Sequence, residues 1–223
     1  LYNSVLKNLN INKKNKFSLV IEPGMAFSNS KVILPKLEKF RKRLSFSKKN
    51  NFSYEAHSTD YQKLKTLKKL VKNNFRFLKV GPELTFYFYQ AIKKMEEIEH
   101  MYCNKKSNIE YELINAMQRD DKYWKDYYKG TKNKIKFLKL NSYLDRMRYY
   151  WDSKKVKKSM NKLIKNINTI PAEVFKKTLK LKSNEGKKMN KINLSNSDYI
   201  IFYYLSSTIK KYYSACNFKI KNL

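Results

Sequence analysis

Residues 75–86 read FRFLKVGPELTF, and this stretch decides how the first part of the chain is built. Residues 75–80 form a short apolar run of the kind that makes a buried strand. Gly81-Pro82 ends the run, because proline cannot donate to a strand ladder and is favoured in the first turn of a helix. We therefore expect a strand, a turn and a long helix with these apolar positions turned inward: Leu84, Tyr87, Phe88, Ala91, Met95 and Ile98.

The segments before this stretch repeat the same order. The apolar runs 17–22 (FSLVIE) and 52–56 (FSYEA) predict two more strands. Apolar residues at helical spacing predict a helix over 32–44 and another over 61–75, with Asp60 as a helix cap. Three strands that alternate with helices indicate βα units and a parallel sheet, so the fold class is α/β.

From about residue 105 the pattern is mainly helical. Apolar residues over 156–167 predict a helix that ends before Pro171, and residues 199–216 predict a terminal helix. The polar, lysine-rich segment 182–196 between them predicts a loop. We therefore divide the chain into a βα segment, residues 1–104, and a helical C-terminal extension, residues 105–223.

The chain carries a formal net charge of +32, and the cause of this charge decides which partners to expect. Of its 50 basic residues only six are arginines, and the lysines are spread along the whole sequence. A face built for nucleic acid concentrates its charge and favours arginine. Compositional bias therefore explains the charge better than selected polyanion binding, and we expect nucleic acid to bind only non-specifically, through charge.

Membrane insertion and disulfide chemistry are not expected. The sequence has no stretch of about 18 apolar residues, the length that a membrane-spanning helix needs. Cys103 and Cys216 are too far apart for a C-x-x-C metal or redox motif. They are typical of reduced thiols in a cytoplasmic protein.

Polar side chains follow the predicted strands and form the candidate site. Because parallel strands end at one edge of a sheet, Glu22, His57 and Lys79 are expected to lie near one another. Glu55 shares the strand face of His57 at i−2. Lys79 supplies a point charge for a phosphate, and the glycine in the turn after it allows the backbone to approach closely.

His57 is open to three interpretations. It can ligate a divalent metal, line a pocket without present catalysis, or make a structural hydrogen bond. Asp60 orients the imidazole or caps the next helix. One histidine and two carboxylates do not by themselves make a zinc site, which uses three or four well-placed ligands. Any metal at His57 therefore needs ligands from other parts of the fold.

Two features of the extension have candidate roles outside catalysis. Asp145, Arg146 and Arg148 include two of the six arginines and suit a buried ion-pair network or a subunit contact. The aromatic side chains at 123–128 suit the core of the extension or a platform for a ligand: Tyr123, Trp124, Tyr127 and Tyr128.

Several of these segments together resemble one family. The matching motifs are IEPGMAF at 21–27, YEAHSTDYQ at 54–62, LVKNNFRFLKVGPELTF at 70–86, YWKDYY at 123–128 and DRMRYYW at 145–151. In this order and spacing they resemble the non-catalytic, GatZ/KbaZ-like subunit of class II D-tagatose-1,6-bisphosphate aldolase. The resemblance covers roughly residues 18–217, and Glu83 and Leu144 depart from it, standing where relatives usually have a small residue and serine.

The resemblance implies a (β/α)₈ barrel with a helical extension, of which this chain corresponds to the C-terminal part: about three βα units and the extension. It also implies an accessory subunit that supports a catalytic aldolase subunit in galactitol and tagatose 6-phosphate catabolism. A sugar phosphate would bind in the loops beginning at His57 and Gly81, where barrels often hold phosphate. Class II aldolases use a divalent metal such as zinc to polarise the ketose carbonyl, so the resemblance makes His57 a candidate ligand of such a metal. The alternatives are an independent metal-dependent sugar-phosphate aldolase or ketose epimerase, and a polyanion-binding protein.

Overall fold

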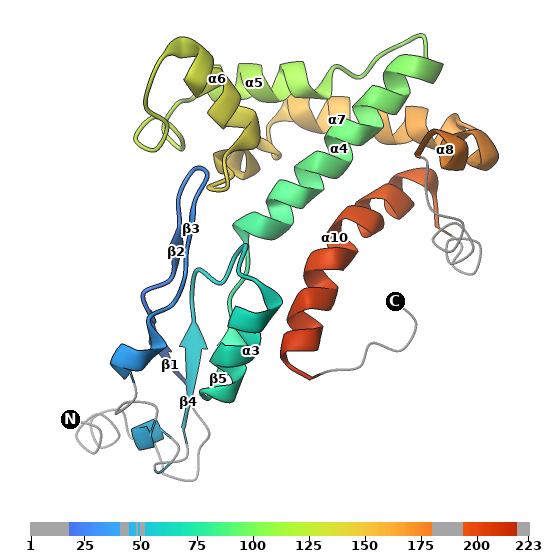
Figure 1. Cartoon of the computed structure of the whole chain (residues 1–223). Coiled ribbons are helices and arrows are strands. Elements are labelled where there is room, and N and C mark those ends of the chain that lie inside the picture. The colour runs from blue at the N-terminus through green and yellow to red at the C-terminus, as the bar shows by residue number, and fades with distance from the viewer. Residues whose placement is uncertain (1–17, 41–44, 48, 50–51, 180–193, 218–223) are drawn as a thin grey trace. The chain divides into compact units, whose positions relative to one another are not determined.

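The computed structural model describes residues 18–40, 45–47, 49, 52–179 and 194–217. These residues form two compact units (Figure 1). The first contains residues up to 27, 31–80 and 211–217, and the second contains 28–30 and 81–210. The sequence-based boundary between residues 104 and 105 stays a prediction.

The first unit is built on a three-stranded parallel sheet. Its strands are β1 (Ser18–Ile21), β4 (Ser53–Ala56) and β5 (Phe75–Leu78), in the order β1-β4-β5. Helix α3 (Leu64–Lys72) is the connection from β4 to β5. The predicted parallel sheet and its three strands are therefore confirmed.

One face of this sheet is packed and the other is open. Tyr54 and Phe75 are buried together with Leu67 and Leu70 of α3, in the core of the unit. On the opposite face Val20 lies opposite Glu55, and Glu55 lies opposite Phe77. Val20 is 54% exposed and Phe77 is 56% exposed, although parallel sheets are usually covered on both faces.

A register shift explains how two phenylalanines at i and i+2 reach opposite faces. Phe75 pairs with Tyr54, but the next residue of β4, Glu55, pairs with Phe77. The residue between the two phenylalanines therefore has no counterpart on β4, as in a β-bulge. Because a shift of one residue moves a side chain to the other face, Phe75 is buried while Phe77 is exposed.

The prediction of one helix over residues 32–44 is wrong for its described part. Val32–Ile33 forms strand β3, which pairs with β2 (Ala26–Phe27) in an antiparallel hairpin, and Leu37–Phe40 forms the short 3₁₀ helix η1. Pro35 lies between them and would break a helix, since it lacks the N–H and clashes with the preceding turn. Residues 41–44 lie outside the described residues.

The predicted cap of the next helix is also wrong. Helix α3 begins at Leu64 with Lys63 at its N-cap, three residues after Asp60. Ser58 and Tyr61 have positive φ angles of 56° and 60°, which a helix cannot accommodate. The loop therefore continues past Asp60, which is buried in it with 3% exposure.

The second unit is helical, as the sequence predicts. It contains α4 (Pro82–Tyr102), α5 (Ile109–Arg119), α6 (Lys132–Asn141), the 3₁₀ helix η2 (Arg146–Tyr150), α7 (Lys154–Thr169), α8 (Ala172–Leu179) and most of α10 (Asn196–Ala215). Helices α4, α5 and α7 lie side by side and share one apolar core (Figure 1). Its largest buried side chains include Ile92, Met95, Ile98, Leu113, Met117, Leu163 and Ile167.

The predicted ends of these helices are mostly confirmed. Helix α7 ends at Thr169 with Ile170 as its C-cap, directly before Pro171. The terminal helix α10 begins at Asn196, whose side-chain amide donates to the carbonyl oxygens of Ile167 and Ile170 at 3.0 and 2.8 Å. Most of the predicted loop over 182–196 lies outside the described residues.

A buried carboxylate fixes the turn between α4 and α5. Glu99 is fully buried, and its Oε2 accepts hydrogen bonds from the backbone N–H and the hydroxyl of Ser107, at 2.9 and 2.6 Å. The side-chain amide of Asn166 donates to its other oxygen. These bonds replace water around the carboxylate, which a buried charge requires.

No helix of the described residues is both long and apolar enough to cross a membrane. This finding agrees with the sequence, which has no long apolar stretch.

The two faces of β5 give a direct test of the sheet. Phe75→Ala should lower the free energy of unfolding by about 3–5 kcal/mol, because it removes a fully buried ring and leaves a cavity. Phe77→Ala removes the same atoms from an exposed position and should cost less than about 1 kcal/mol. Urea unfolding followed by circular dichroism measures both, and equal costs would contradict the register shift.

Candidate functional site

The carboxyl edge of the parallel sheet carries three of the predicted site residues. Glu22, His57 and Lys79 each come directly after a strand: β1, β4 and β5 respectively. The last residues of these strands are in register, since Ala56 pairs with both Ile21 and Leu78. The structure therefore brings these three residues to one edge of the first unit.

His57 and Glu55 form a pair at this edge. The imidazole Nε2 lies 2.8 Å from Glu55 Oε1, and the two side chains are 30% and 31% exposed. The shared strand face predicted from the i, i+2 spacing is thus present. A half-exposed imidazole that contacts a carboxylate can bind a polar ligand or exchange a proton with it.

Thr59 holds the loops of this edge together, and sequence analysis missed it. Its hydroxyl donates to the carbonyl oxygen of Lys79 at 2.7 Å, and its own carbonyl accepts from the hydroxyl of Tyr212 at 2.8 Å. Tyr212 belongs to the end of α10 that lies in the first unit. A threonine in a polar loop gives no sequence signal for a partner 153 residues away.

The remaining predicted residues have different surroundings. The Lys79 and Glu22 residues are exposed, which leaves their charged groups accessible to a ligand. Asp60 is buried in the loop after β4. Gly81 belongs to the second unit, as the N-cap of α4, and an added Cβ there would meet no atom within 4 Å. The space beside Gly81 is therefore open in the described residues, and a close approach of a phosphate to its backbone stays a prediction.

The residues present do not fit a complete metal site. His57 and Glu55 supply two donors, whereas zinc sites in proteins use three or four. Among the described residues, no group of three or more His, Cys, Asp and Glu side chains is arranged to hold a metal ion. Any metal bound at His57 would need ligands from elsewhere.

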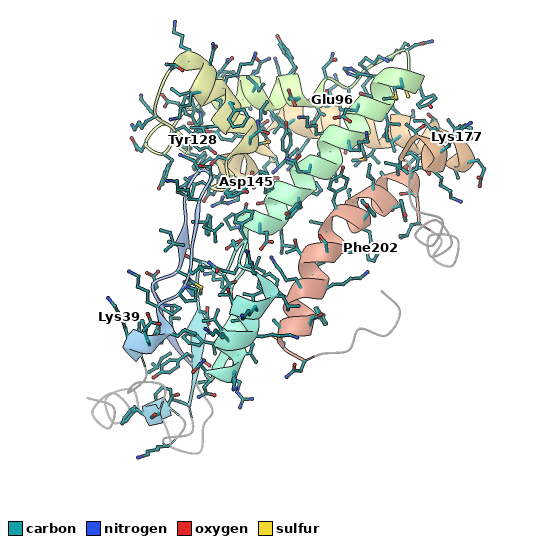
Figure 2. The ribbon with its side chains drawn as sticks, in the orientation of Figure 1. Lys39, Glu96, Tyr128, Asp145, Lys177 and Phe202 are labelled. Carbon is teal, nitrogen blue, oxygen red and sulfur yellow. The ribbon has the colours of Figure 1, made fainter. Side chains whose placement is uncertain are left out.

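In the second unit, Asp145 is buried in the turn before η2. It is 5% exposed, has a φ of 43°, and accepts a hydrogen bond from the hydroxyl of Thr85. Burial raises the pKa of its carboxyl to about 6, against the opposing effects of the Thr85 hydrogen bond and the Arg148 charge. Figure 2 labels Asp145 and Tyr128 in this unit.

Arg148 closes the same turn. Its guanidinium donates to the carbonyl oxygens of Leu144 and Asp145 at 2.6 and 2.8 Å, and to the hydroxyl of Tyr149 at 2.7 Å. The two carbonyl bonds come from Nη1 and the hydroxyl bond comes from Nη2, so the planar guanidinium donates in two directions from separate nitrogens, whereas a lysine has a single one. This geometry accounts for an arginine at this position in a lysine-rich chain.

The aromatic residues at 123–128 divide between core and surface. Tyr128 is 1% exposed and belongs to the core of the second unit, with Tyr123 and Trp124 packed against that core. The indole N–H of Trp124 donates to the carbonyl oxygen of Met117 at 2.5 Å. Tyr127, in contrast, is 45% exposed. The core interpretation therefore describes three of the four residues.

The raised pKa of Asp145 makes stability depend on pH. Burial raises its pKa from the ordinary value of 3.8 to about 6 in the folded protein, so folding favours the protonated form. The associated stability is present below about pH 4 and is lost as the pH rises through 6, by about 3 kcal/mol in total. Asp145→Asn keeps an acceptor for Thr85 and tolerates the positive φ, but it does not titrate.

Urea unfolding between pH 4.5 and 7.5 should therefore show the variant gaining stability relative to the unmodified chain as the pH rises. The comparison cancels the titration of the other carboxylates. A difference that does not change with pH would contradict a buried, protonated Asp145.

Known proteins are similar to this chain in sequence and in structure. Two curated relatives are described as D-tagatose-1,6-bisphosphate aldolase subunit GatZ, from Salmonella dublin and Salmonella paratyphi B. Each is 32% identical to this chain over 155 residues, which is 69% of this chain and 37% of the relative. The chain thus spans well under half the length of the curated relatives it matches.

A solved structure is similar as well. The crystal structure of a probable tagatose 6 phosphate kinase from Sinorhizobium meliloti 1021 aligns with a TM-score of 0.77 at 25% identity. The alignment covers 89% of this chain and 52% of that chain. A family model described as D-tagatose-1,6-bisphosphate aldolase subunit GatZ/KbaZ-like matches residues 7–217, which include the three strands, the His57–Glu55 pair and the Asp145 turn. This chain therefore belongs to the D-tagatose-1,6-bisphosphate aldolase subunit GatZ/KbaZ-like family.

Proposed function

We propose that this chain acts as a non-catalytic accessory subunit of D-tagatose-1,6-bisphosphate aldolase. It would bind a catalytic aldolase subunit in the cytoplasm and support its activity and stability during galactitol and tagatose 6-phosphate catabolism. The observation that carries the proposal is the family match over residues 7–217.

We further infer that the parallel sheet is part of a (β/α)₈ barrel. Helix α3 covers one face of the sheet, while Val20 and Phe77 are exposed on the other. Such a face is normally buried in α/β proteins, and closure into a barrel buries it against the interior. In this proposal further strands pair with β1 and β5, the outer strands of the described sheet.

The carboxyl edge of this sheet is the proposed binding site for a sugar phosphate. Lys79 supplies an exposed positive charge, and the His57–Glu55 pair supplies polar groups for sugar hydroxyls. Glu22 follows the neighbouring strand β1 and adds an acceptor at the same edge. This arrangement orients one anionic end and one hydroxyl-bearing part of a ligand.

A second candidate is an independent metal-dependent aldolase or epimerase, which the His57–Glu55 pair favours. The small number of metal-binding side chains counts against this independent enzyme. Only two lie together at His57, and the Asp60 carboxylate is buried in the loop that follows. A complete site would need ligands that the described residues do not provide.

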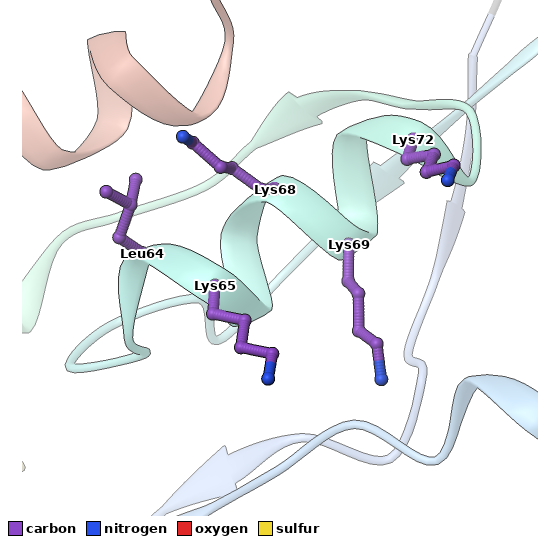
Figure 3. Close-up of a pocket in the computed structure, with 5 residues that line it drawn as sticks. All are labelled: Leu64, Lys65, Lys68, Lys69 and Lys72. Atoms are coloured by element: carbon purple, nitrogen blue, oxygen red, sulfur yellow. The ribbon is translucent and has the colours of Figure 1, made fainter.

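Polyanion binding is supported by one surface of the first unit. Four lysines and Leu64, all from α3, surround a shallow hollow of about 340 Å³ (Figure 3): Lys65, Lys68, Lys69 and Lys72. Lysines at this spacing make a positive stripe that attracts phosphate groups. The stripe contains no arginine fork or aromatic ring, so it favours contact through charge alone.

The accessory role is tested by adding the purified chain to a purified catalytic tagatose-bisphosphate aldolase subunit. We expect co-elution in size-exclusion chromatography, higher aldolase activity and a longer half-life of the catalytic subunit at elevated temperature. The control is bovine serum albumin at equal mass, which accounts for non-specific protection.

Absence of both binding and activation would contradict the accessory role. Aldolase turnover by the chain alone, lost in His57→Ala, would favour the independent enzyme instead.

The ligand site is tested by titrating D-tagatose 1,6-bisphosphate into the chain in a calorimeter. Lys79→Ala should raise the Kd by about tenfold or more, because it removes a charge-assisted contact to phosphate. Lys158→Ala removes the same charge from an exposed position on α7, away from the α3 lysines, and should leave the Kd nearly unchanged. Equal effects of the two substitutions would mean that the ligand responds only to net charge.

A further inference from the structure

Arg146 is held at both ends by two consecutive tyrosines. Its backbone N–H donates to the hydroxyl of the buried Tyr128 at 3.1 Å. Its guanidinium carbon lies 3.3 Å from the centre of the Tyr127 ring and 5.8 Å from that of Tyr149. The side chain is therefore fixed in place before any partner arrives, which lowers the entropy cost of using it for binding.

The hydrogen-bonding capacity of this guanidinium is unused within the part of the chain that the structure describes. Its Nε is buried and has no acceptor there. Arg148, two residues further along η2, instead bonds two carbonyl oxygens and a tyrosine hydroxyl. Because the Nε of Arg146 is enclosed by neighbouring side chains, a group from outside can reach only the two terminal Nη groups, which make no hydrogen bond to the described residues.

The surroundings of Arg146 form a surface of arginine and tyrosine, which we call the Arg–Tyr patch. Tyr127 and Tyr149 are 45% and 42% exposed. Tyr123 stacks on Tyr149 with ring centres 4.8 Å apart, and the Arg148 guanidinium lies 4.4 Å from the Tyr149 ring centre. Arginine and tyrosine are the residue types that most often dominate binding energy in protein interfaces. The patch consists of Tyr123, Tyr127, Arg146, Arg148 and Tyr149.

The contacts inside the patch decide which class of partner fits. A nucleic-acid strand would need free aromatic faces on which its bases could stack. Here Arg146 covers a face of Tyr127, while Tyr123 and Arg148 lie against the ring of Tyr149. What stays available is the guanidinium edge of Arg146, whose planar donors match a carboxylate.

The net charge of the chain further limits the class of partner that fits the Arg–Tyr patch. A second copy of this chain would bring another net charge of +32 to the interface, which repels association. The nearby acidic side chains of Asp120 and Asp121 already form ion pairs, with Lys122 at 3.4 Å and Lys125 at 2.9 Å. An acidic surface on a different protein complements the patch best.

We propose that the Arg–Tyr patch is the surface through which this chain docks an acidic partner protein, with an Asp or Glu carboxylate of the partner paired to Arg146. Resting on the proposed function, the partner is the catalytic aldolase subunit. Tyr127 and Tyr149 pack around the ion pair and exclude water from it, which strengthens the pair.

The experiment measures the Kd between the catalytic aldolase subunit and four forms of the full chain by biolayer interferometry: the unmodified chain and the variants Arg146→Ala, Arg146→Lys and Arg119→Ala. Arg146→Ala should raise the Kd on the order of 30-fold, the effect of a central interface arginine. Arg119→Ala is the matched control, because it removes the same charge from an exposed position at the end of α5 and should change the Kd less than about twofold. Circular dichroism melts check that the variants fold.

Arg146→Lys keeps the positive charge but not the planar fork, and should still raise the Kd about tenfold. It also serves as the test variant if Arg146→Ala does not fold. Equal Kd values for the unmodified chain and the Arg146 variants would contradict docking through the Arg–Tyr patch. The accessory role would not be affected by that result. Failure of the unmodified chain to bind would overturn both.

Binding of a labelled oligouridine tests whether the Arg–Tyr patch binds nucleic acid instead of a protein. We expect its binding to weaken equally in the Arg146 and Arg119 variants, in proportion to the lost charge. Loss of oligouridine binding in the Arg146 variants alone, with binding to the catalytic subunit intact, would assign the patch to nucleic acid and overturn the proposal.

Discussion

Strand β4 pairs in parallel with β1 on one side and β5 on the other, and the organisation of the first unit follows from this pairing. Because all three strands run the same way and end in register, Glu22, His57 and Lys79 come to the same edge. The same ladder separates a face packed under α3 from an open face that carries Glu55. The candidate ligand site is thus a consequence of strand direction rather than of a local motif.

In the second unit, buried polar contacts have an organising role of a different kind. Thr85 donates to the Asp145 carboxylate, and Arg148 ties down the carbonyl oxygens of the turn. Tyr128, buried in the core, accepts the N–H of Arg146. This network costs stability through the buried carboxylate, yet it fixes the backbone from which Arg146 presents its guanidinium. We see it as the support of the Arg–Tyr patch.

The two units therefore suggest separate contributions to one accessory role. The first has an edge suited to a polar, anionic ligand but too few donors for a metal site of its own. The second has a preorganised arginine whose guanidinium makes no hydrogen bond to the described residues. The accessory role itself is proposed from the match to the GatZ/KbaZ-like family over residues 7–217.

Much of the fold could be predicted from local patterns. Short apolar runs bounded by Gly and Pro marked β1, β4 and β5, and apolar spacing of three and four marked the helices. The misassigned helix over 32–44 shows the limit of this approach, because the apolar spacing of a hairpin around Pro35 imitates a helical stripe. The cap assigned to Asp60 failed since positive φ angles at Ser58 and Tyr61 cannot be read from residue type alone.

The sequence by itself determined the parallel α/β class, the helical extension, the family and the strand-end positions of Glu22, His57 and Lys79, because these depend on periodicity and on neighbours along the chain. Only the tertiary structure decided which face of β5 is buried, which hydroxyl holds the loops of the site, and which arginine stacks on Tyr127. Those outcomes depend on a register shift opposite β4, on the contact of Thr59 with Tyr212, and on the stacking of Arg146 against Tyr127. Each of these contacts depends on how the chain packs in three dimensions, and local sequence patterns do not encode that packing.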